Sequence, residues 1–166
     1  CASSMRARAK ELLLLLAWLL PCAAPALAQQ AEEHEVKAAF LFKFPSFVEW
    51  PKEALGAGAL VIGVAGADAV ADELEAIVAG RSVQGRPVQV RRLMQGEPLQ
   101  GLHLLFIGRA QAAQLAEAQR SAPRQPLLVV CEWEGALESG AVVNFVRSDG
   151  RVRFEVALDA AERRGL

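Results

Sequence analysis

The sequence predicts a single three-layer α/β domain, with a mainly parallel sheet flanked by helices and a β-hairpin at one edge. Short apolar runs rich in β-branched residues alternate along the chain with stretches of helical period. These runs are apolar almost throughout, as is typical of strands buried on both faces of a sheet. Residues 141–158 instead form two strand-like runs around an Asp-Gly pair, which indicates a hairpin.

The chain begins with a predicted export signal. We assign residues 1–28 to a leader, in which Met5 is a natural start and Ala28 the last residue of the signal peptide. A basic segment precedes an apolar one at residues 12–20, and an Ala-Leu-Ala motif ends the leader. We therefore expect cleavage after Ala28 and a periplasmic mature protein. The basic residues are Arg6, Arg8 and Lys10.

Two alternatives to a cleaved signal are a membrane anchor and a lipid attached at Cys22. The apolar stretch up to residue 28 is interrupted by Pro21 and Pro25. It is also shorter than the roughly 20 residues that a membrane-spanning helix needs. Pro21 directly before Cys22 fits lipid attachment poorly.

Residues 29–166 have the length of one domain, without linkers or repeats. Of the 18 basic and 19 acidic residues, 15 and 18 lie after the leader, so the net charge is about −3. This charge predicts neither nucleic-acid binding nor a polybasic membrane patch. Only Cys131 would remain in the mature chain, which excludes an internal disulfide and, within its apolar run, favours a buried thiol.

The first element of the domain is a predicted helix over residues 32–50, with acidic residues in its first turn and an apolar period near 3.6. Pro45 should kink or split it near residues 41–44, and Pro51 should end it. Five aromatic residues fall within residues 40–50 and could form a core stripe, a ligand-stacking surface or an anchor for a protein or membrane. They are Phe40, Phe42, Phe44, Phe47 and Trp50.

The remaining elements follow in alternation. Buried strands are predicted over residues 59–66, 102–108 and 126–132, and a half-buried strand over 87–93 after a turn at 84–87. Helices are predicted over residues 68–79 and 110–121, and loops over 94–101 and 133–140. The hairpin turn lies at residues 148–150, and Asp159 is expected to cap a last helical segment.

The motifs of familiar enzymes are absent, so the sequence favours a binding module without catalytic residues, metal site or cofactor. Gly63 and Gly66 lack the third glycine of a dinucleotide-binding turn and the lysine of a P-loop. His34 and His103 have no metal-ligand spacing with Cys131. No nucleophilic serine motif occurs. His103, which opens a strand, is expected to be structural. The spacing of Glu132 and Glu134 alone does not distinguish an acid/base pair from ordinary surface charge.

Several ordered blocks resemble the YfiR family of small exported proteins, also known by its DUF4154-type domain. The opening VKAAFLFKFPSFVEWP followed by LVIGVAG is the strongest match, and the similarity extends over residues 34–166. The other matching blocks are GRSVQGRPVQVRRL (80–93), LHLLFIG (102–108), PLLVVCEWEGALESGAVVNFV (126–146) and GRVRFEVALDAAERRGL (150–166).

The resemblance implies a regulatory binding protein of the periplasm that is often a homodimer. Such a protein binds the periplasmic part of an inner-membrane diguanylate cyclase and represses it, which lowers cyclic di-GMP and biofilm formation. A small-molecule ligand or stress relieves the repression. The alternatives are an exported small-molecule-binding domain that acts on another membrane sensor, such as a histidine kinase, and an enzyme with an unrecognised site.

Three departures from the family pattern affect these implications. Leu102 replaces a cysteine that often precedes the histidine, which argues against redox control by a disulfide. Ala157 replaces an asparagine after the strand at 152–156. The family continues into another helix after Gly165 and Leu166, so the C-terminal helix is expected to be truncated.

The candidate contact residues lie in two segments. Helical spacing places Phe40, Phe44 and Phe47 on one face, where we expect them to pack in the core. Phe42 and Trp50 point elsewhere and are candidates for a partner surface. Along the second hairpin strand, an exposed face opposite residues 152, 154 and 156 is a candidate partner or ligand site, in which Arg153 could pair with an anion. Its residues are Arg151, Arg153 and Glu155.

Overall fold

The computed structural model describes residues 24–121 and 125–166, which belong to two units, residues 1–32 and residues 33–166. In the first unit the described residues are helical and form the start of α2 (Ala24–Lys43). The second unit holds every other element. The basic and apolar segments of the predicted leader and Cys22 lie outside the described residues. Among the described helices, none has both the length and the apolar character that a membrane span requires.

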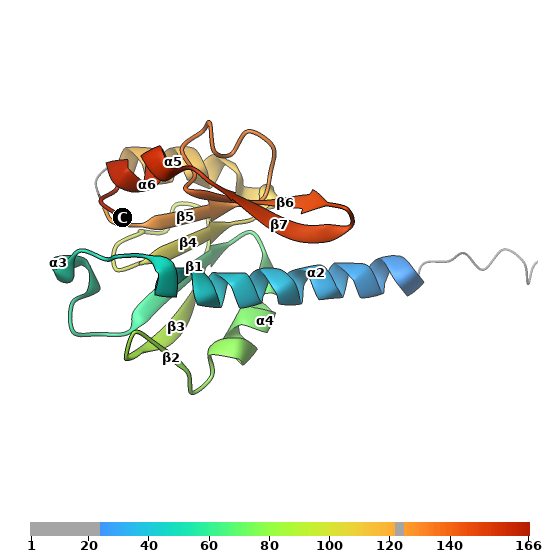
Figure 1. Ribbon diagram of the computed structural model, residues 1–166, viewed down its shortest axis with the longest axis horizontal. Coiled ribbons are helices and arrows are strands. Elements are labelled where there is room, and N and C mark those ends of the chain that lie inside the picture. Colours follow the sequence, from blue (N-terminus) through green and yellow to red (C-terminus); the bar gives the residue numbers. More distant parts are fainter. Residues whose placement is uncertain (1–23, 122–124) are drawn as a thin grey trace, which may run out of the picture. The chain divides into compact units, whose positions relative to one another are not determined.

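The second unit is built on a seven-stranded sheet with the order β2-β3-β1-β4-β5-β6-β7 (Figure 1). The central strands β3, β1, β4, β5 and β6 are parallel, while β2 and β7 pair antiparallel at the two edges. The predicted α/β class with a hairpin at one edge is confirmed. The strands are β1 (Leu60–Ala65), β2 (Ser82–Val83), β3 (Arg86–Leu93), β4 (Leu104–Ile107), β5 (Leu128–Cys131), β6 (Val143–Ser148) and β7 (Arg151–Val156).

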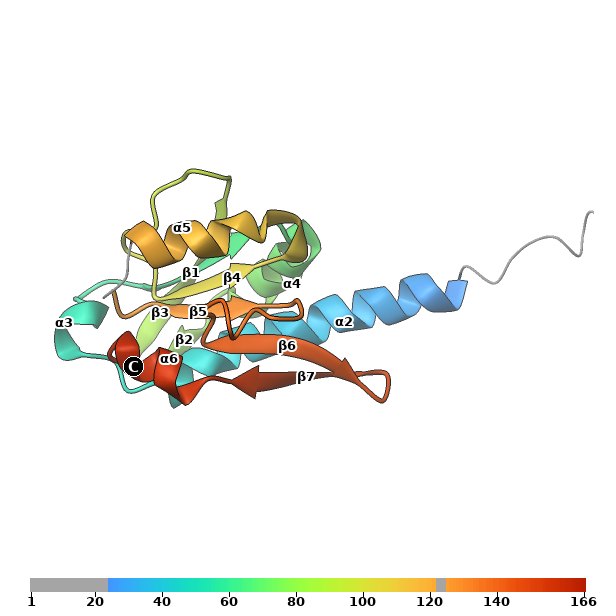
Figure 2. The ribbon, with the colours of Figure 1, turned by 90° about the horizontal axis from the view of Figure 1, so that it is seen from above.

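Helices cover both faces of the sheet, which completes the three predicted layers. The second-unit part of α2 lies with α4 and α6 on one face, and α5 lies on the other (Figure 2). Two separate apolar clusters fill the spaces between these layers. The shorter elements are η1 (Phe44–Phe47), α3 (Lys52–Leu55), α4 (Asp68–Val78), η2 (Arg109–Gln111), α5 (Ala113–Ser121) and α6 (Leu158–Arg163).

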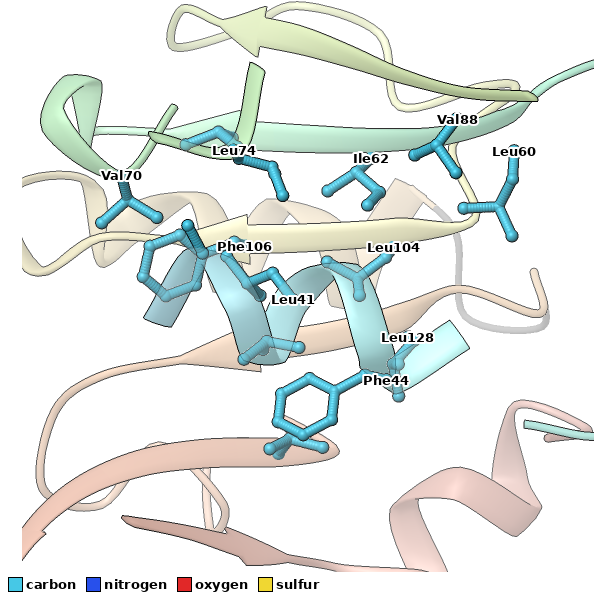
Figure 3. Packing of buried hydrophobic residues seen from close by; sticks show 14 of the residues in the cluster. Leu41, Phe44, Leu60, Ile62, Val70, Leu74, Val88, Leu104, Phe106 and Leu128 are labelled. Atoms are coloured by element: carbon cyan, nitrogen blue, oxygen red, sulfur yellow. The ribbon is translucent and has the colours of Figure 1, made fainter. Parts of the chain in front are cut away.

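The larger apolar cluster joins α2 and α4 to all the parallel strands. Leu41 and Phe44 reach the sheet from α2 and η1, and Leu74 reaches it from α4 (Figure 3). Phe106, from the central strand β4, is fully buried between them. Burial of each such side chain contributes roughly 1.5–3 kcal/mol, so this face holds α2 in place.

Two predicted helices differ from the structure at one of their ends. The helix predicted over residues 32–50 ends at Lys43, where Pro45 converts the chain to the 3₁₀ helix η1, as expected for proline. The expectation that Asp159 caps the last helix is wrong. Ala157 occupies the N-cap of α6 without a side-chain bond, and Asp159 accepts a hydrogen bond of 2.7 Å from Arg163 instead.

Two tight turns connect the antiparallel strand pairs at the two edges of the sheet. Asp149 and Gly150 have φ of 53° and 73° and connect β6 to β7, as the Asp-Gly pair predicts. Gln84 and Gly85 have similar values, 51° and 75°, and connect β2 to β3. The strand β2 was not predicted, because two residues are too few to show a period.

The order in which the chain adds strands to the sheet reverses between β1 and β4: β3 is added on one side of this pair and β5 on the other. The helix after β1 crosses to one face and the helix after β4 crosses to the other, which makes the carboxyl ends of these strands a topological switch point. Gly108 lies there and donates a backbone hydrogen bond of 2.7 Å to Ala65. A Cβ added to Gly108 would overlap the carbonyl group of Gly66, so the two backbones close the switch point tightly.

We predict that Gly108→Ala lowers the free energy of unfolding by about 1–3 kcal/mol, because the added methyl group must displace backbone. The φ of Gly108 is −72°, which alanine adopts freely, so the cost is purely steric. The matched control is Gly58→Ala, whose added Cβ would meet nothing within 4 Å. Urea unfolding measures both, and equal stability of the two variants would contradict the tight contact.

Candidate functional site

An aromatic cluster joins the N-terminal helix to the C-terminal hairpin. Phe154 of β7 makes edge contacts with Phe40 and Phe44, at ring-centroid distances of 5.3 and 5.0 Å. Phe145 of β6 packs against both from the neighbouring strand, at 6.2 and 5.8 Å. The prediction that Phe40 and Phe44 pack against the sheet is confirmed. Segments far apart in the sequence are held together by these rings.

The burial of Phe47 and Trp50 is the opposite of what the helical spacing predicts. Phe47 is 83% exposed, because the 3.6-residue period ends at Lys43 and does not extend through η1. Trp50 is buried, its Nε1–H donates to the carbonyl oxygen of Pro45 at 3.1 Å, and its ring meets His103 edge-on at 5.9 Å. The expectation of an exposed Trp50 is therefore wrong, and it belongs to the core.

Phe42 is half-buried rather than free. Its ring packs against the larger apolar cluster, and the guanidinium carbon of Arg81 lies 5.8 Å from the ring centroid. Arg81 directly precedes β2, at the edge of the sheet opposite β7. The five predicted contact residues therefore do not form one site. A contact role for Phe42 stays a prediction.

His103 and Cys131 have structural surroundings. The Nδ1 atom of His103 accepts a hydrogen bond of 3.0 Å from the backbone N–H of Val61. Burial lowers the pKa of His103, and the nearby charge of Arg86 acts in the same direction, against a backbone hydrogen bond with Ala54. Cys131 is fully buried, and burial followed by the charge of Glu132 raises the pKa of its thiol. These groups fit the predicted structural roles.

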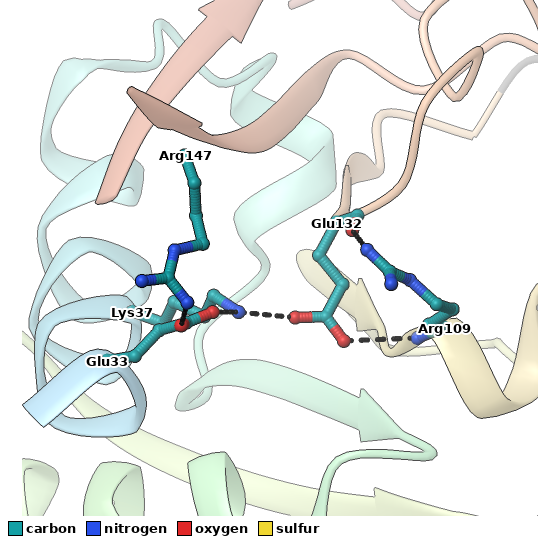
Figure 4. A network of polar contacts seen from close by, with 5 residues as sticks. All are labelled: Glu33, Lys37, Arg109, Glu132 and Arg147. Atoms are coloured by element: carbon teal, nitrogen blue, oxygen red, sulfur yellow. Dashed lines mark hydrogen bonds and ion pairs between the residues drawn. The ribbon is translucent and has the colours of Figure 1, made fainter. Parts of the chain in front are cut away.

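A charged cluster lies at the carboxyl edge of the sheet, near the switch point (Figure 4). The buried Lys37 of α2 donates to Glu33 at 2.6 Å and to Glu132, just after β5, at 2.7 Å. The second oxygen of Glu33 accepts from Arg147 at 3.0 Å, and that of Glu132 accepts from the backbone N–H of Arg109 at 3.1 Å. Every carboxylate oxygen of the cluster is thus occupied.

The cluster binds elements together rather than presenting a reactive group. Burial raises the pKa of Glu33, but the hydrogen bond and charge of Lys37, with Arg147 and His34, hold it below its ordinary value of 4.5. A carboxylate so engaged is a poor general base. The sequence does not predict this cluster, because Lys37 and Glu132 are 95 residues apart and no local pattern connects them. Within residues 24–121 and 125–166, no group of three or more His, Cys, Asp or Glu is placed to hold a metal ion.

The exposed candidates are on β7 and next to it. Arg151, Arg153 and Glu155 are exposed and share the strand face that points away from the aromatic cluster. Of the six large apolar side chains that are exposed in the described residues, four lie on η1, β7 and α6, while Leu27 and Met94 lie elsewhere. We call these four the apolar patch: Phe47, Phe154, Val156 and Leu158, which are 83, 42, 47 and 72% exposed.

We predict that Trp50→Ala lowers the free energy of unfolding by about 3–5 kcal/mol, because it leaves a cavity and removes the hydrogen bond to the carbonyl oxygen of Pro45. Phe47→Ala is the control and should change it by less than about 0.5 kcal/mol, since its ring already lies in water. Chemical denaturation followed by circular dichroism measures both. If Trp50→Ala is as stable as the wild type, the ring does not belong to the core and is again a candidate surface contact.

We predict that Lys37→Met lowers stability at pH 7 by about 2–3 kcal/mol, because Glu33 and Glu132 lose the cation between them. The stability from the lowered pKa of Glu33 is present above pH 4.5 and disappears as the pH falls through that lowered pKa. The variant should therefore lose less stability on acidification than the wild type. Lys52→Met, which removes an exposed cation outside the cluster, should leave the acid dependence unchanged. Parallel acid profiles of Lys37→Met and wild type would contradict the network.

Comparison with known proteins gives one clear result. A family model described as YfiR/HmsC-like (DUF4154) matches residues 34–166, which is most of the chain. A search of curated proteins found no match. The matched range includes the aromatic cluster, the apolar patch and all members of the charged cluster except Glu33, which immediately precedes it.

Proposed function

The chain belongs to the YfiR/HmsC-like family, which is a family of periplasmic, non-catalytic regulators in cyclic di-GMP signalling, and we propose that it represses an inner-membrane diguanylate cyclase. In this proposal the mature protein, after cleavage at Ala28, binds the periplasmic part of the cyclase. Members of the family interact with membrane partners. The particular partner is the proposed step.

The apolar patch is the observation that supports this proposal. Exposed apolar side chains that gather on neighbouring elements mark protein-binding surfaces, and a soluble domain gains nothing from leaving Phe47 in water. Phe47 stands on η1, whose Phe44 is fixed by Phe145 and Phe154. A rigidly supported, exposed aromatic ring loses little conformational entropy on binding. We therefore assign Phe47 as an anchor of the cyclase interface.

The mechanism is differential binding. A bound protein can lower the activity of the cyclase only if it prefers the inactive conformation of the periplasmic part. The free energy available for repression is the difference between its affinities for the two conformations. Phe42, beside Arg81, is a second candidate contact, and the exposed Arg151, Arg153 and Glu155 of β7 are further candidates.

We predict that Phe47→Asp reduces capture of the periplasmic part of the cyclase by at least about tenfold, because a charged group must be desolvated in an apolar interface. In cells, cyclic di-GMP should rise to the level of a deletion strain. Met94→Asp is the matched control, since Met94 is 73% exposed but lies after β3, outside the patch. Pull-down with tagged cyclase segments and a cyclic di-GMP assay give the two measurements.

Three outcomes overturn parts of this proposal. If a deletion strain keeps its cyclic di-GMP level and no cyclase is recovered, the regulatory target is wrong. Recovery of a histidine kinase instead would favour the alternative sensor. If Phe47→Asp and Met94→Asp bind the cyclase equally well, the cyclase remains the proposed target, but the apolar patch is not the surface that binds it.

A further inference from the structure

His103 joins three strands of the sheet at their amino ends. Its backbone N–H donates to the carbonyl oxygen of Val61 at 2.9 Å, and its Nδ1 atom accepts from the N–H of the same residue at 3.0 Å. Its own carbonyl oxygen accepts from the N–H of Leu128 at 2.8 Å. The imidazole therefore adds one bond to the parallel pairing of β1 with β4, at the point where β5 also begins.

The imidazole can make this bond only while it is neutral. Nδ1 accepts from Val61, so the proton of the neutral ring is on Nε2, where a backbone hydrogen bond with Ala54 of α3 engages it. A second proton would bind Nδ1 and turn this acceptor into a donor that faces another donor. His103 is only 6% exposed, so water does not replace the lost bond unless the ring moves.

A fixed cation next to His103 also opposes a second proton. Arg86 of β3 is held there by hydrogen bonds of 2.9 and 3.0 Å to the carbonyl oxygens of Leu55 and Gly58. Burial, with the charge of Arg86, lowers the pKa of His103 despite the hydrogen bond with Ala54. The charged groups on the elements packed next to the ring are Glu49, Lys52, Glu53, Arg86 and Arg164.

The same ring supports the segment that carries Phe47. Its edge contact with Trp50 has a centroid distance of 5.9 Å, and Trp50 Nε1–H donates to the carbonyl oxygen of Pro45 at 3.1 Å. Pro45 lies in η1, two residues before Phe47. Imidazole, indole and 3₁₀ helix thus form one series of contacts from the sheet to the exposed ring. A change in the position of the imidazole therefore changes the support of Phe47.

We propose that His103 is an acid-sensitive latch, which holds Trp50 and η1 against the sheet while the imidazole is neutral and releases them when it is protonated. The protonated ring loses its bond with Val61 and turns toward water, so its contact with Trp50 is lost as well. Trp50 then no longer fixes Pro45, and Phe47 loses the rigid support that favours binding. This last step rests on the proposed function, whereas the release itself does not.

The latch makes stability depend on pH in a definite direction. The unfolded chain binds the proton of His103 more readily than the folded chain, so acid lowers stability. Stability is complete above pH 6.5, the ordinary pKa of histidine, and declines as the pH falls from there to the lowered pKa of His103. The unfolding equilibrium constant should rise by up to about tenfold per pH unit in this range. Urea unfolding of the exported protein between about pH 5 and 8 measures this change.

His103→Asn removes the titration and keeps an acceptor. The amide oxygen of asparagine can accept from Val61 N–H at the place of Nδ1, but it does not titrate. This variant should be less stable than the wild type at neutral pH, and its stability should not change with pH in this range. His34→Asn, which removes the other histidine of the chain, is the matched control and should keep the acid dependence of the wild type. If His103→Asn keeps it as well, the proposal is wrong.

Nuclear magnetic resonance of the wild type tests the latch even if His103→Asn does not fold. The imidazole signals of His103 should titrate with a midpoint below pH 6.5. The protection of Val61 N–H and Trp50 Nε1–H from hydrogen exchange, corrected for the intrinsic effect of pH, should fall with the same midpoint. If the imidazole titrates and both groups stay protected, protonation releases nothing and the proposal fails.

Capture of the periplasmic part of the cyclase tests the consequence for binding. The wild type should bind it at least about threefold more weakly at pH 5 than at pH 8, whereas His103→Asn should bind equally at both. If the wild type captures no cyclase at either pH, the proposed function fails and the latch stands on the two tests above. If capture does not change with pH although Trp50 is released, the latch does not regulate the apolar patch, and that part of the proposal is overturned.

Discussion

The packing of α2 on the β6–β7 hairpin is the contact on which the rest of the second unit depends. Phe40 and Phe44 lie against Phe145 and Phe154, and this contact covers the half of the sheet that α4 does not reach. It also brings Lys37 to the end of β5, where it joins Glu33 to Glu132. The exposed ring of Phe47 and the open edge of β7 are both positioned by it. An apolar contact thus sets the geometry of the polar and binding surfaces.

The sequence predicted the strands and helices well where their signals were local. Apolar runs marked β1, β4 and β5, helical period marked α4, and the Asp-Gly pair marked the turn before β7. Pro45 correctly indicated the end of α2. Local patterns are sufficient for these elements, because burial on both faces, helical period and positive φ each restrict which residue types occur at neighbouring positions.

The candidate site was predicted less well, because it depends on contacts that are distant in the sequence. Spacing assigned Phe47 to the core and Trp50 to the surface, but the period stopped at Lys43 and the chain turned Trp50 back toward His103. No local pattern connects Lys37 with Glu132, 95 residues later. The exposure of Arg151, Arg153 and Glu155 was predicted correctly, because alternation along a strand is a local pattern.

The position of the aromatic cluster also determines when the fold can be completed. Glu33 and Arg147, which the same contact brings together, are 114 residues apart, so α2 closes one of the longest loops in the chain. A contact of such separation forms late, after the local strand–helix units. Because a chain is synthesised from its N-terminus, the apolar face of α2 is made well before its partner hairpin. During that interval the aromatic residues lack their partners, and exposed apolar surface of this kind favours aggregation.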